Sequence, residues 1–187
     1  MLEIQTIFIY LFLFFIMFAL CERIKHTVSW TDIIIIAFIY SVIFGLRYDV
    51  GADYLSYFES YRSVSISSYN INYYNYEVGF RSMILFLTSL NIHYAWFFGI
   101  VAFLQLFLIL GSVRTYHKVY QYLIFTFMIG CVWLSFANGL RQELAFCCFA
   151  MALSFVEKKQ YYWYYALIVL DVCLFQLLLL YLKLLFY

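Results

Sequence analysis

Charged and phenolic side chains gather in the stretch GLRYDVGADYLSYFESY, which covers residues 45–61. Its Arg47, Asp49 and Asp53 lie within seven residues, whereas only 11% of the whole chain is charged. A guanidinium group can bind phosphate oxygens bidentately and stabilise a departing anion, and a carboxylate can accept a proton as a general base. The stretch is therefore a candidate site for a phosphate-bearing ligand. Two structural alternatives stay open, because Arg47 could extend from a membrane span to the headgroups and Asp53 could cap a helix.

Two later stretches also place polar groups next to apolar runs. NYEVGFRSM contains Glu77, Gly79 and Arg81, and FANGLRQELAF contains Asn138, Arg141 and Gln142. An ionisable group at the start of an apolar span needs a partner, so Arg141 is a stronger functional candidate than Arg47. Glu77 could accept a proton, or its charge could stabilise the first turn of a helix. Gly79 could serve close packing alone.

The composition indicates a membrane protein. Hydrophobic residues make up 67% of the chain, and the net charge is only +1. Soluble domains contain about 45–50% apolar and about 25% charged residues, so water could not solvate the surface of this chain. The small net charge excludes the broad basic field of a nucleic-acid-binding protein. The cysteines and histidines show no metal-ligand spacing, so we expect no metal site.

The apolar runs predict an all-α, polytopic integral membrane protein with about six transmembrane helices. A span needs about 20 apolar residues. The expected spans are residues 4–20, 32–46, 94–110, 120–137, 140–156 and 161–182. Residues 78–90 are apolar but shorter and contain Arg81, which favours a re-entrant or interfacial helix that does not cross. All of these belong to a single transmembrane domain.

The positive residues predict the orientation of the chain. If residues 78–90 do not cross, the three basic loops, which contain Arg23 and Lys25, Arg114 and Lys118, and Lys158 and Lys159, all face the cytoplasm. The amino terminus and the polar region 47–77 then lie outside; if residues 78–90 do cross, the last two basic loops change sides. The predicted outer face contains four arginines and no lysine: Arg47, Arg62, Arg81 and Arg141. Arginine's planar fork suits phosphate, which favours a phosphate-bearing ligand there.

Aromatic residues add two features to the outer region. Tyr54, Tyr57, Phe58 and Tyr61 follow the spacing of one helix face. This spacing predicts a short amphipathic helix with its aromatic rings in the headgroup zone. The tract SSYNINYYNY, at residues 67–76, could bind sugars through rings and amides, or it could form an ordinary aromatic belt.

Three motifs in this order resemble the EpsG family. They are R-x-D-V-G-A-D-Y-x-x-Y (Arg47–Tyr57), Y-E-V-G-F (Tyr76–Phe80) and N-G-L-R-Q-E-L-A (Asn138–Ala145). Members of this family are multi-span proteins of bacterial exopolysaccharide, capsule and O-antigen assembly, regarded as Wzy-type polymerases. The resemblance implies a chain in the bacterial cytoplasmic membrane that joins oligosaccharide repeat units carried on polyprenyl pyrophosphate at its outer face.

The resemblance also implies roles for particular residues. Arg47 and Arg141 would stabilise the departing pyrophosphate, and Asp53 or Glu77, with Asp49 behind them, would act as the general base. The substrate-binding residues would be Asp49, Tyr54, Tyr57, Gly79, Arg81, Asn138 and Gln142. The lipid-linked donor is already activated, so no metal, nucleotide or other cofactor is implied. Partners would be the lipid bilayer and other membrane proteins of polysaccharide assembly.

The sequence also departs from the family pattern. Val78 stands where members often have proline, and LFQLLLLY has Phe175 but Gln176 where members have histidine. The chain ends at Tyr187, about half the usual family length, so it resembles the amino-terminal half of a polymerase, whether active or inactive. A non-enzymatic membrane scaffold and a transporter or flippase subunit of a polysaccharide export system are the alternative functions.

Overall fold

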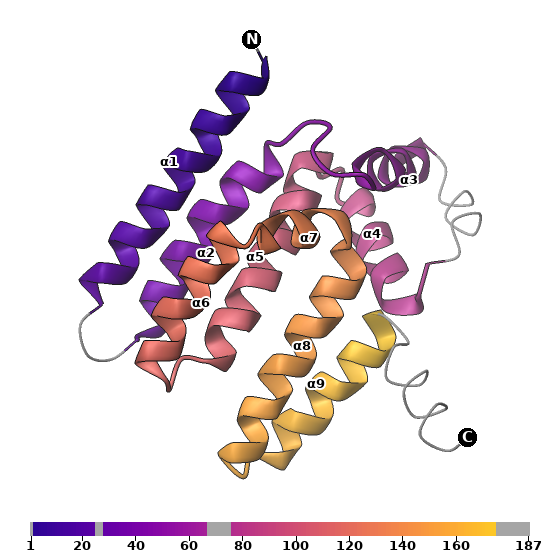
Figure 1. The fold of residues 1–187 in the computed structure, drawn as a ribbon. Coiled ribbons are helices and arrows are strands. Elements are labelled where there is room, and N and C mark those ends of the chain that lie inside the picture. The colour runs from indigo at the N-terminus through magenta and orange to yellow at the C-terminus, as the bar shows by residue number, and fades with distance from the viewer. Residues whose placement is uncertain (1, 25–27, 67–75, 175–187) are drawn as a thin grey trace, which may run out of the picture.

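The computed structural model describes residues 2–24, 28–66 and 76–174, and every regular element in these ranges is a helix (Figure 1). The helices are α1 (Leu2–Arg23), α2 (Trp30–Gly45), α3 (Tyr54–Ile66), α4 (Val78–Ser89), α5 (Tyr94–Ser112), α6 (His117–Ile129), α7 (Val132–Asn138), α8 (Leu140–Glu157) and α9 (Tyr161–Leu174). The all-α prediction is confirmed. Parts of two predicted features lie outside the described residues. These are the last part of the span at 161–182 and most of the tyrosine-rich tract at 67–76.

Fewer helices than the six predicted spans are long and apolar enough to cross a membrane. Among the described residues, α5 is the one helix that is long and apolar enough to cross a bilayer, and α6 with α7 also qualifies if the bent pair counts as one span. α2 and α4 are apolar but shorter. Each of the six expected spans contains a helix, but six crossings are not confirmed.

The span predicted at residues 120–137 is wrong as a single helix. The chain there forms α6 and α7, whose axes are bent by 71°. The amide of Gly130 donates to the carbonyl of Thr126, which ends α6, and Cys131 then adopts a left-handed conformation with φ of 54°. Apolar composition is continuous across the bend, so hydropathy alone could not locate it.

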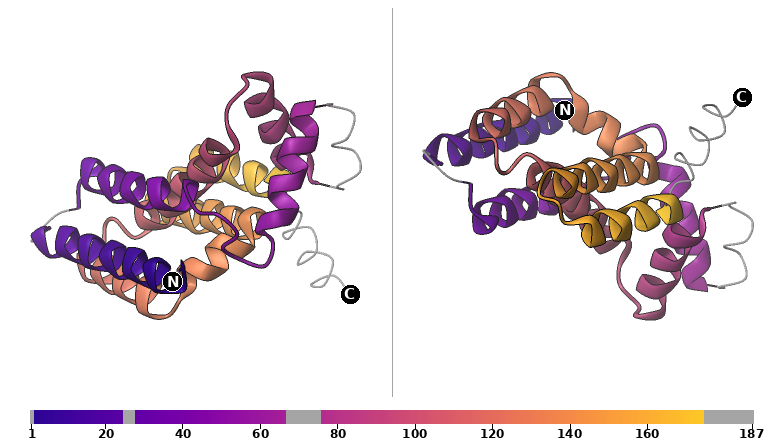
Figure 2. Two further views of the ribbon diagram at one scale, coloured as in Figure 1. Left: turned by 90° about the horizontal axis from the view of Figure 1, so that it is seen from above. Right: turned by 90° about the horizontal axis from the view of Figure 1, so that it is seen from below.

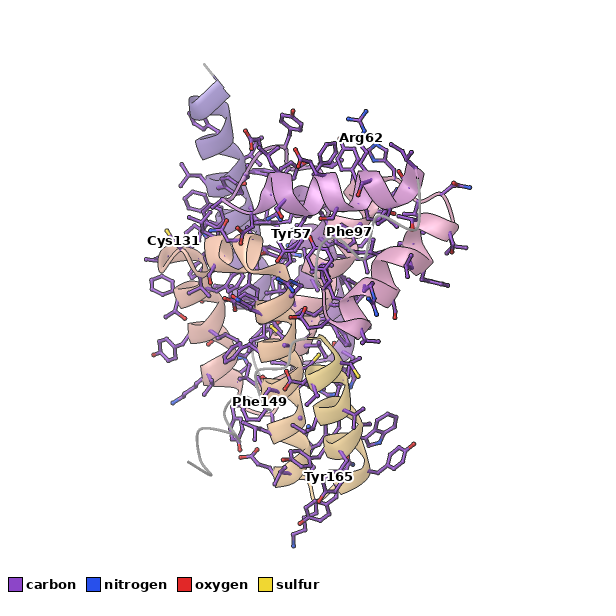
Figure 3. All side chains as sticks on the ribbon, turned by 90° about the vertical axis from the view of Figure 1, so that its right-hand side faces the viewer. Tyr57, Arg62, Phe97, Cys131, Phe149 and Tyr165 are labelled. Carbon is purple, nitrogen blue, oxygen red and sulfur yellow. The ribbon has the colours of Figure 1, made fainter. Side chains whose placement is uncertain are left out.

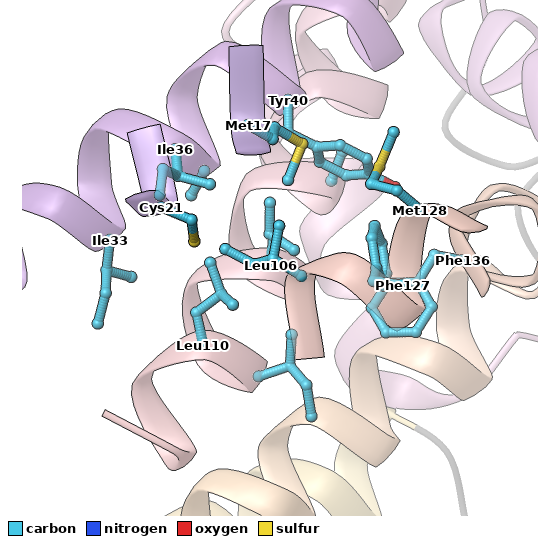
Figure 4. Packing of buried hydrophobic residues seen from close by; sticks show 14 of the residues in the cluster. Met17, Cys21, Ile33, Ile36, Tyr40, Leu106, Leu110, Phe127, Met128 and Phe136 are labelled. Carbon is cyan, nitrogen blue, oxygen red and sulfur yellow. The ribbon is translucent and has the colours of Figure 1, made fainter. Parts of the chain in front are cut away.

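α5 lies at the centre of the bundle, between α2 and α8, while α1 packs on α2 and α6 (Figures 1 and 2). One buried cluster joins α1, α2, α5 and α6 through residues such as Met17, Tyr40, Leu106 and Phe127 (Figure 4). A second cluster joins α3, α4, α5 and α8. α5 contributes to both clusters, so it connects the two halves of the molecule.

The turns that carry the basic residues lie together at one end of the bundle (Figure 1). Arg114 donates from Nε to the carbonyl of Val28 at 3.0 Å, and the ring of His117 bonds to the carbonyl of Ile24. The hydroxyl of Tyr116 donates to the carboxylate of Glu157 at 2.9 Å. These bonds tie together three turns far apart in the sequence, so their positive charges share one end.

Many large apolar side chains point away from the bundle. On α1, Phe8, Phe12 and Phe15 are each more than 60% exposed and follow one face of the helix. Such a ridge would be unfavourable in water and suits a lipid environment.

α2 and α5 approach each other closely because small residues line their contact. A Cβ atom added at Gly45 would lie 2.8 Å from the carbonyl oxygen of Ala95 and 3.1 Å from the Cα of Gly99. One added at Gly99 would lie 3.3 Å from the carbonyl oxygen of Ser41. Small residues four apart on facing helices are the usual means of close helix packing in membranes.

We expect Gly45→Ala to destabilise the protein, although alanine is favoured over glycine in a helix by about 0.8–1.0 kcal/mol. The added methyl group meets backbone atoms, and overpacking of this kind costs about 1–3 kcal/mol. Thermal unfolding of the purified protein in detergent, followed by circular dichroism, measures the effect. Ile35→Val, at a position of the same helix that is 50% exposed, is the control and should change stability by less than about 0.5 kcal/mol. A Gly45→Ala protein that melts above the wild type would contradict the close packing.

Candidate functional site

The aromatic face of α3 packs on the protein. α3 lies across one end of the bundle, with Tyr57 pointing into it and Arg62 pointing away (Figure 3). Tyr54 is fully buried and stacks on Phe98 at 4.9 Å between ring centroids. The helix predicted from the spacing is confirmed, but the expectation that its rings lie in the headgroup zone is wrong. Protein rings from α4 and α5 cover them instead.

The loop after α2 forms hydrogen bonds to the break between α7 and α8, which is the interruption of the helix at Gly139. Arg47 donates from Nη2 to the carbonyl of Ala137 at 2.9 Å, and the amide of Ala52 donates to Oδ1 of Asn138 at 2.8 Å. Gly51 has φ of +105°, and a Cβ atom there would lie 2.3 Å from the same Oδ1 atom. A glycine is therefore needed for the loop to reach Asn138. The first and third motifs of the sequence interlock at this point.

Arg47 is surrounded by the protein. Only 7% of it is exposed, and its guanidinium carbon lies 5.1 Å from the ring centre of Phe98 and 5.6 Å from that of Phe44. Its Nε has no hydrogen-bond partner among the described residues. Burial lowers the pKa of Arg47, while the nearby Tyr40, Tyr10 and Tyr54 act in the opposite direction. The alternative of a side chain that extends to the headgroups is wrong, because Arg47 turns inward.

Arg141 and Glu77 form an ion pair that joins the second motif to the third. Nη1 of Arg141, in the first turn of α8, lies 2.5 Å from Oε2 of Glu77, the N-cap residue of α4. The two side chains are 22% and 16% exposed, so both are half-buried and can be reached from outside. The guanidinium group of Arg141 also lies over the ring of Tyr76 at 4.8 Å.

The phenol of Tyr57 lies close to Arg141. Burial raises the pKa of Tyr57, and the interaction with the guanidinium group of Arg141 opposes that rise. The phenol therefore stays protonated at neutral pH, and only 6% of Tyr57 is exposed. The charge of the nearby Asp53 also raises the pKa of Tyr57, which places that carboxylate within electrostatic reach of the phenol.

A row of aromatic rings connects the two arginines. We define the aromatic row as Tyr54, Phe98, Phe97, Phe80 and Tyr76, whose consecutive ring centroids lie 4.9–5.9 Å apart. Arg47 lies over its first members and Arg141 over its last. The row contains rings from the first two motifs, and Arg141 of the third motif packs on it.

The remaining predicted residues take other positions. Asp49 is exposed and has a left-handed backbone with φ of 51°, and Gln142 is exposed next to Arg141. Arg81 is half-buried on α4. A Cβ atom at Gly79 would lie 2.8 Å from the carbonyl oxygen of Cys173, so this glycine allows α4 to pack on α9. Asp53 is exposed just before α3.

The sequence analysis did not single out Gln105. This side chain is 1% exposed and donates to the carbonyls of Phe136 and Leu140, on both sides of the break before α8. The signal was present, because it is the one amide in the apolar run YAWFFGIVAFLQLFLIL. A membrane-buried amide needs partners, but the sequence cannot name them.

A cavity of about 640 Å³ opens between α2 and α5. Its lining includes Phe38, Val42, Trp96, Ile100 and Phe103, and the predicted site residues are not part of it. The apolar lining suits a hydrocarbon chain and offers little for polar chemistry. No group of three or more His, Cys, Asp or Glu side chains that could hold a metal occurs in the described part of the chain.

The family model of the EpsG family matches residues 30–187. The chain belongs to the EpsG family. The match includes all three motifs, so the residues that converge on the aromatic row lie within the region shared with the family. No curated protein and no solved structure matches the chain.

We expect Gly51→Ala to destabilise this EpsG-family protein. A left-handed backbone costs a residue with a Cβ atom about 1–2 kcal/mol, and the methyl group would also displace Asn138. The melting temperature in detergent should fall accordingly. Ala52→Ser is the matched control, because it keeps the backbone amide that bonds to Asn138 and changes an exposed side chain. Equal melting temperatures for both variants would show that the loop does not depend on the glycine.

Proposed function

We propose that this EpsG-family chain is a polysaccharide polymerase of the Wzy type in the bacterial cytoplasmic membrane. It joins oligosaccharide repeat units carried on polyprenyl pyrophosphate at the outer face of that membrane. The proposal rests on one observation above all, the reachable Arg141–Glu77 ion pair at the point where three distant motifs meet. Membership of the EpsG family supports the same reaction class.

Arg141 has the properties of a pyrophosphate-binding group. It lies in the first turn of α8, where the helix itself carries partial positive charge from its free amides. A cation is unfavourable at that position unless an anion neutralises it, and Glu77 does so in this structure. A pyrophosphate group could take the place of Glu77 with bidentate hydrogen bonds from the guanidinium group.

The same exchange gives Glu77 a role in the reaction. The acceptor hydroxyl attacks the anomeric carbon of the growing chain, and the bond from that carbon to the pyrophosphate oxygen breaks. The pyrophosphate leaves with the electron pair, and Arg141 stabilises its charge. Glu77, released from Arg141, accepts the proton of the hydroxyl. Asp53 is the second candidate base, because it is exposed and close to Tyr57.

The other predicted site residues have different proposed roles. Arg47 is nearly buried, so we propose that it holds Ala137 in place at the break before α8 and does not contact substrate. Asn138 is held by the amide of Ala52, and Tyr54 is fully buried, so both shape the site. Tyr57 is only 6% exposed and lies beside Arg141, so we assign it to holding that side chain. The exposed Gln142 next to Arg141 is the group placed to contact sugar hydroxyls.

Replacing Arg141 by lysine tests the polymerase proposal. The full chain is expressed in cells that make lipid-linked repeat units but lack their own polymerase, and polymer length is followed on gels. The wild-type chain should produce a ladder of polymers. Arg141→Lys keeps the charge but loses the planar fork, and removing a group that stabilises a developing anion costs about 10²–10³-fold in rate. Glu77→Gln should also shorten the ladder.

Arg62→Lys is the matched control for this experiment. Arg62 is exposed on the outer side of α3, away from the ion pair, so the ladder should not change (Figure 3). A full ladder from Arg141→Lys would remove Arg141 from the mechanism. Export of unpolymerised units by the wild-type chain, without a ladder, would instead favour a scaffold or a transporter subunit that acts with other membrane proteins of polysaccharide assembly.

The orientation of the chain has a separate test. Single cysteines are placed at Arg62 and at Lys158, both exposed and at opposite ends of the bundle, after the exposed Cys131 and Cys173 are replaced by alanine. In intact cells, a membrane-impermeant maleimide should label position 62 and not position 158. Labelling of position 158 alone would place the Arg141–Glu77 pair on the cytoplasmic side. Labelling of both positions would show that the two ends of the bundle do not lie on opposite sides of the membrane.

A further inference from the structure

Gln105 is a buried amide at the centre of the molecule. It lies within α5, a helix that is long and apolar enough to cross a membrane, and only 1% of it is exposed. Placing an amide in an apolar environment is unfavourable unless its hydrogen-bonding groups are satisfied. A leucine would be more favourable at this position for packing alone. The partners of Gln105 therefore indicate what the amide does.

Both donors of Gln105 are used on the break between α7 and α8. Nε2 donates to the carbonyl of Phe136 at 3.3 Å and to the carbonyl of Leu140 at 3.2 Å. These carbonyls lie on the two sides of Gly139, the residue at which the helix is interrupted. Phe136 lies in the last turn of α7, where carbonyls lack intrahelical partners, so an amide from a neighbouring helix can fix the direction of its carbonyl. Leu140 begins α8, so the bond to its carbonyl ties the start of that helix to α5. Arg141 follows Leu140 directly in the chain.

The break is thus held by two different parts of the chain. Arg47 donates to the carbonyl of Ala137, and the amide of Ala52 donates to Asn138, both from the loop after α2. Gln105 acts from α5. With these contacts, residues 136, 137, 138 and 140 are each fixed by a hydrogen bond from outside the break.

We propose that Gln105 is a positioning residue for Arg141, which sets the direction in which α8 begins and so aims the guanidinium group at Glu77 and the incoming pyrophosphate. This role rests on the proposed polymerase function. Gln105 itself does not contact substrate. A displacement of about 1 Å at a reacting group can cost about 10²-fold in rate, so a buried hydrogen bond one residue from Arg141 can control catalysis.

Two substitutions separate the hydrogen bonds from packing. Gln105→Met keeps the length of the side chain but has no donor. Gln105→Glu has a donor only while its carboxyl group is protonated, and a carboxyl group in an apolar interior ionises well above its usual pH. Both variants are made in the full chain, and polymer formation is followed in membranes supplied with lipid-linked repeat units over about pH 5–9.

We expect Gln105→Met to reduce polymer formation by about 10- to 100-fold at every pH, with normal amounts of folded protein. Gln105→Glu should be active at low pH, where the protonated carboxyl group donates. It should fall to the level of Gln105→Met at high pH, where the carboxylate cannot donate. An ionised carboxylate buried at this position also destabilises the fold, so the activity of Gln105→Glu is compared with the amount of folded protein at each pH. A loss of activity while the protein stays folded reports the loss of the donor. Wild-type rates from Gln105→Met, or a wild-type pH profile from Gln105→Glu, would overturn the proposal.

A labelling experiment tests the positioning without polymerisation. Single cysteines at Gln142 and at Val156 lie near the two ends of α8, and both positions are exposed. With Cys131 and Cys173 replaced by alanine, Gln105→Met should change the rate of maleimide reaction at position 142 several-fold and leave position 156 unchanged. If the wild-type chain makes no polymer, the polymerase proposal fails, and this comparison alone decides the positioning role. Equal rates at position 142 with and without Gln105→Met would refute it.

Discussion

Backbone groups at the break between α7 and α8 must find hydrogen-bond partners within the protein, and much of the site follows from that requirement. An interrupted helix leaves carbonyls without intrahelical partners, and an apolar surrounding offers no water to satisfy them. Arg47 and Gln105 supply the donors, from the loop after α2 and from α5. This explains why a chain with so few charged residues buries an arginine and an amide at one place. It also brings three motifs that are distant in the sequence to the start of α8.

The start of α8 in turn determines the electrostatics of the site. Arg141 adds a full positive charge to the positive end of the helix, and Glu77 neutralises it across 2.5 Å. A half-buried pair of this kind contributes little net stability, because desolvation offsets much of the attraction. Its value lies in specificity, since it fixes α4 against α8 and holds a cation where an anionic ligand can compete for it. Tyr57 and Tyr76 surround the guanidinium group and limit the directions from which a ligand can approach.

α5 links this site to the rest of the bundle. Its glycine-lined contact with α2 brings the two helices together, and its aromatic residues Phe97 and Phe98 form the middle of the aromatic row. One helix therefore supports the buried arginine, the ion pair and the break through separate contacts. The apolar cavity between α2 and α5 lies apart from these polar groups. Polar chemistry and hydrocarbon-lined space are thus placed in different parts of the molecule.

The sequence by itself determined the class of protein, the helical character of the apolar runs within the described residues, the helix at residues 54–66 and the membership of the family. These properties depend on composition, on spacing within one helix and on short motifs, all of which are local. Only the tertiary structure decided that Arg47 meets Ala137, 90 residues away, that Glu77 pairs with Arg141, and that Gln105 holds the break. It also decided the 71° bend after Ile129 and the burial of the aromatic face of α3. Periodicity gives the helix face on which a residue lies. Which partner covers that face depends on how the helices pack, and this packing cannot be inferred from any one segment.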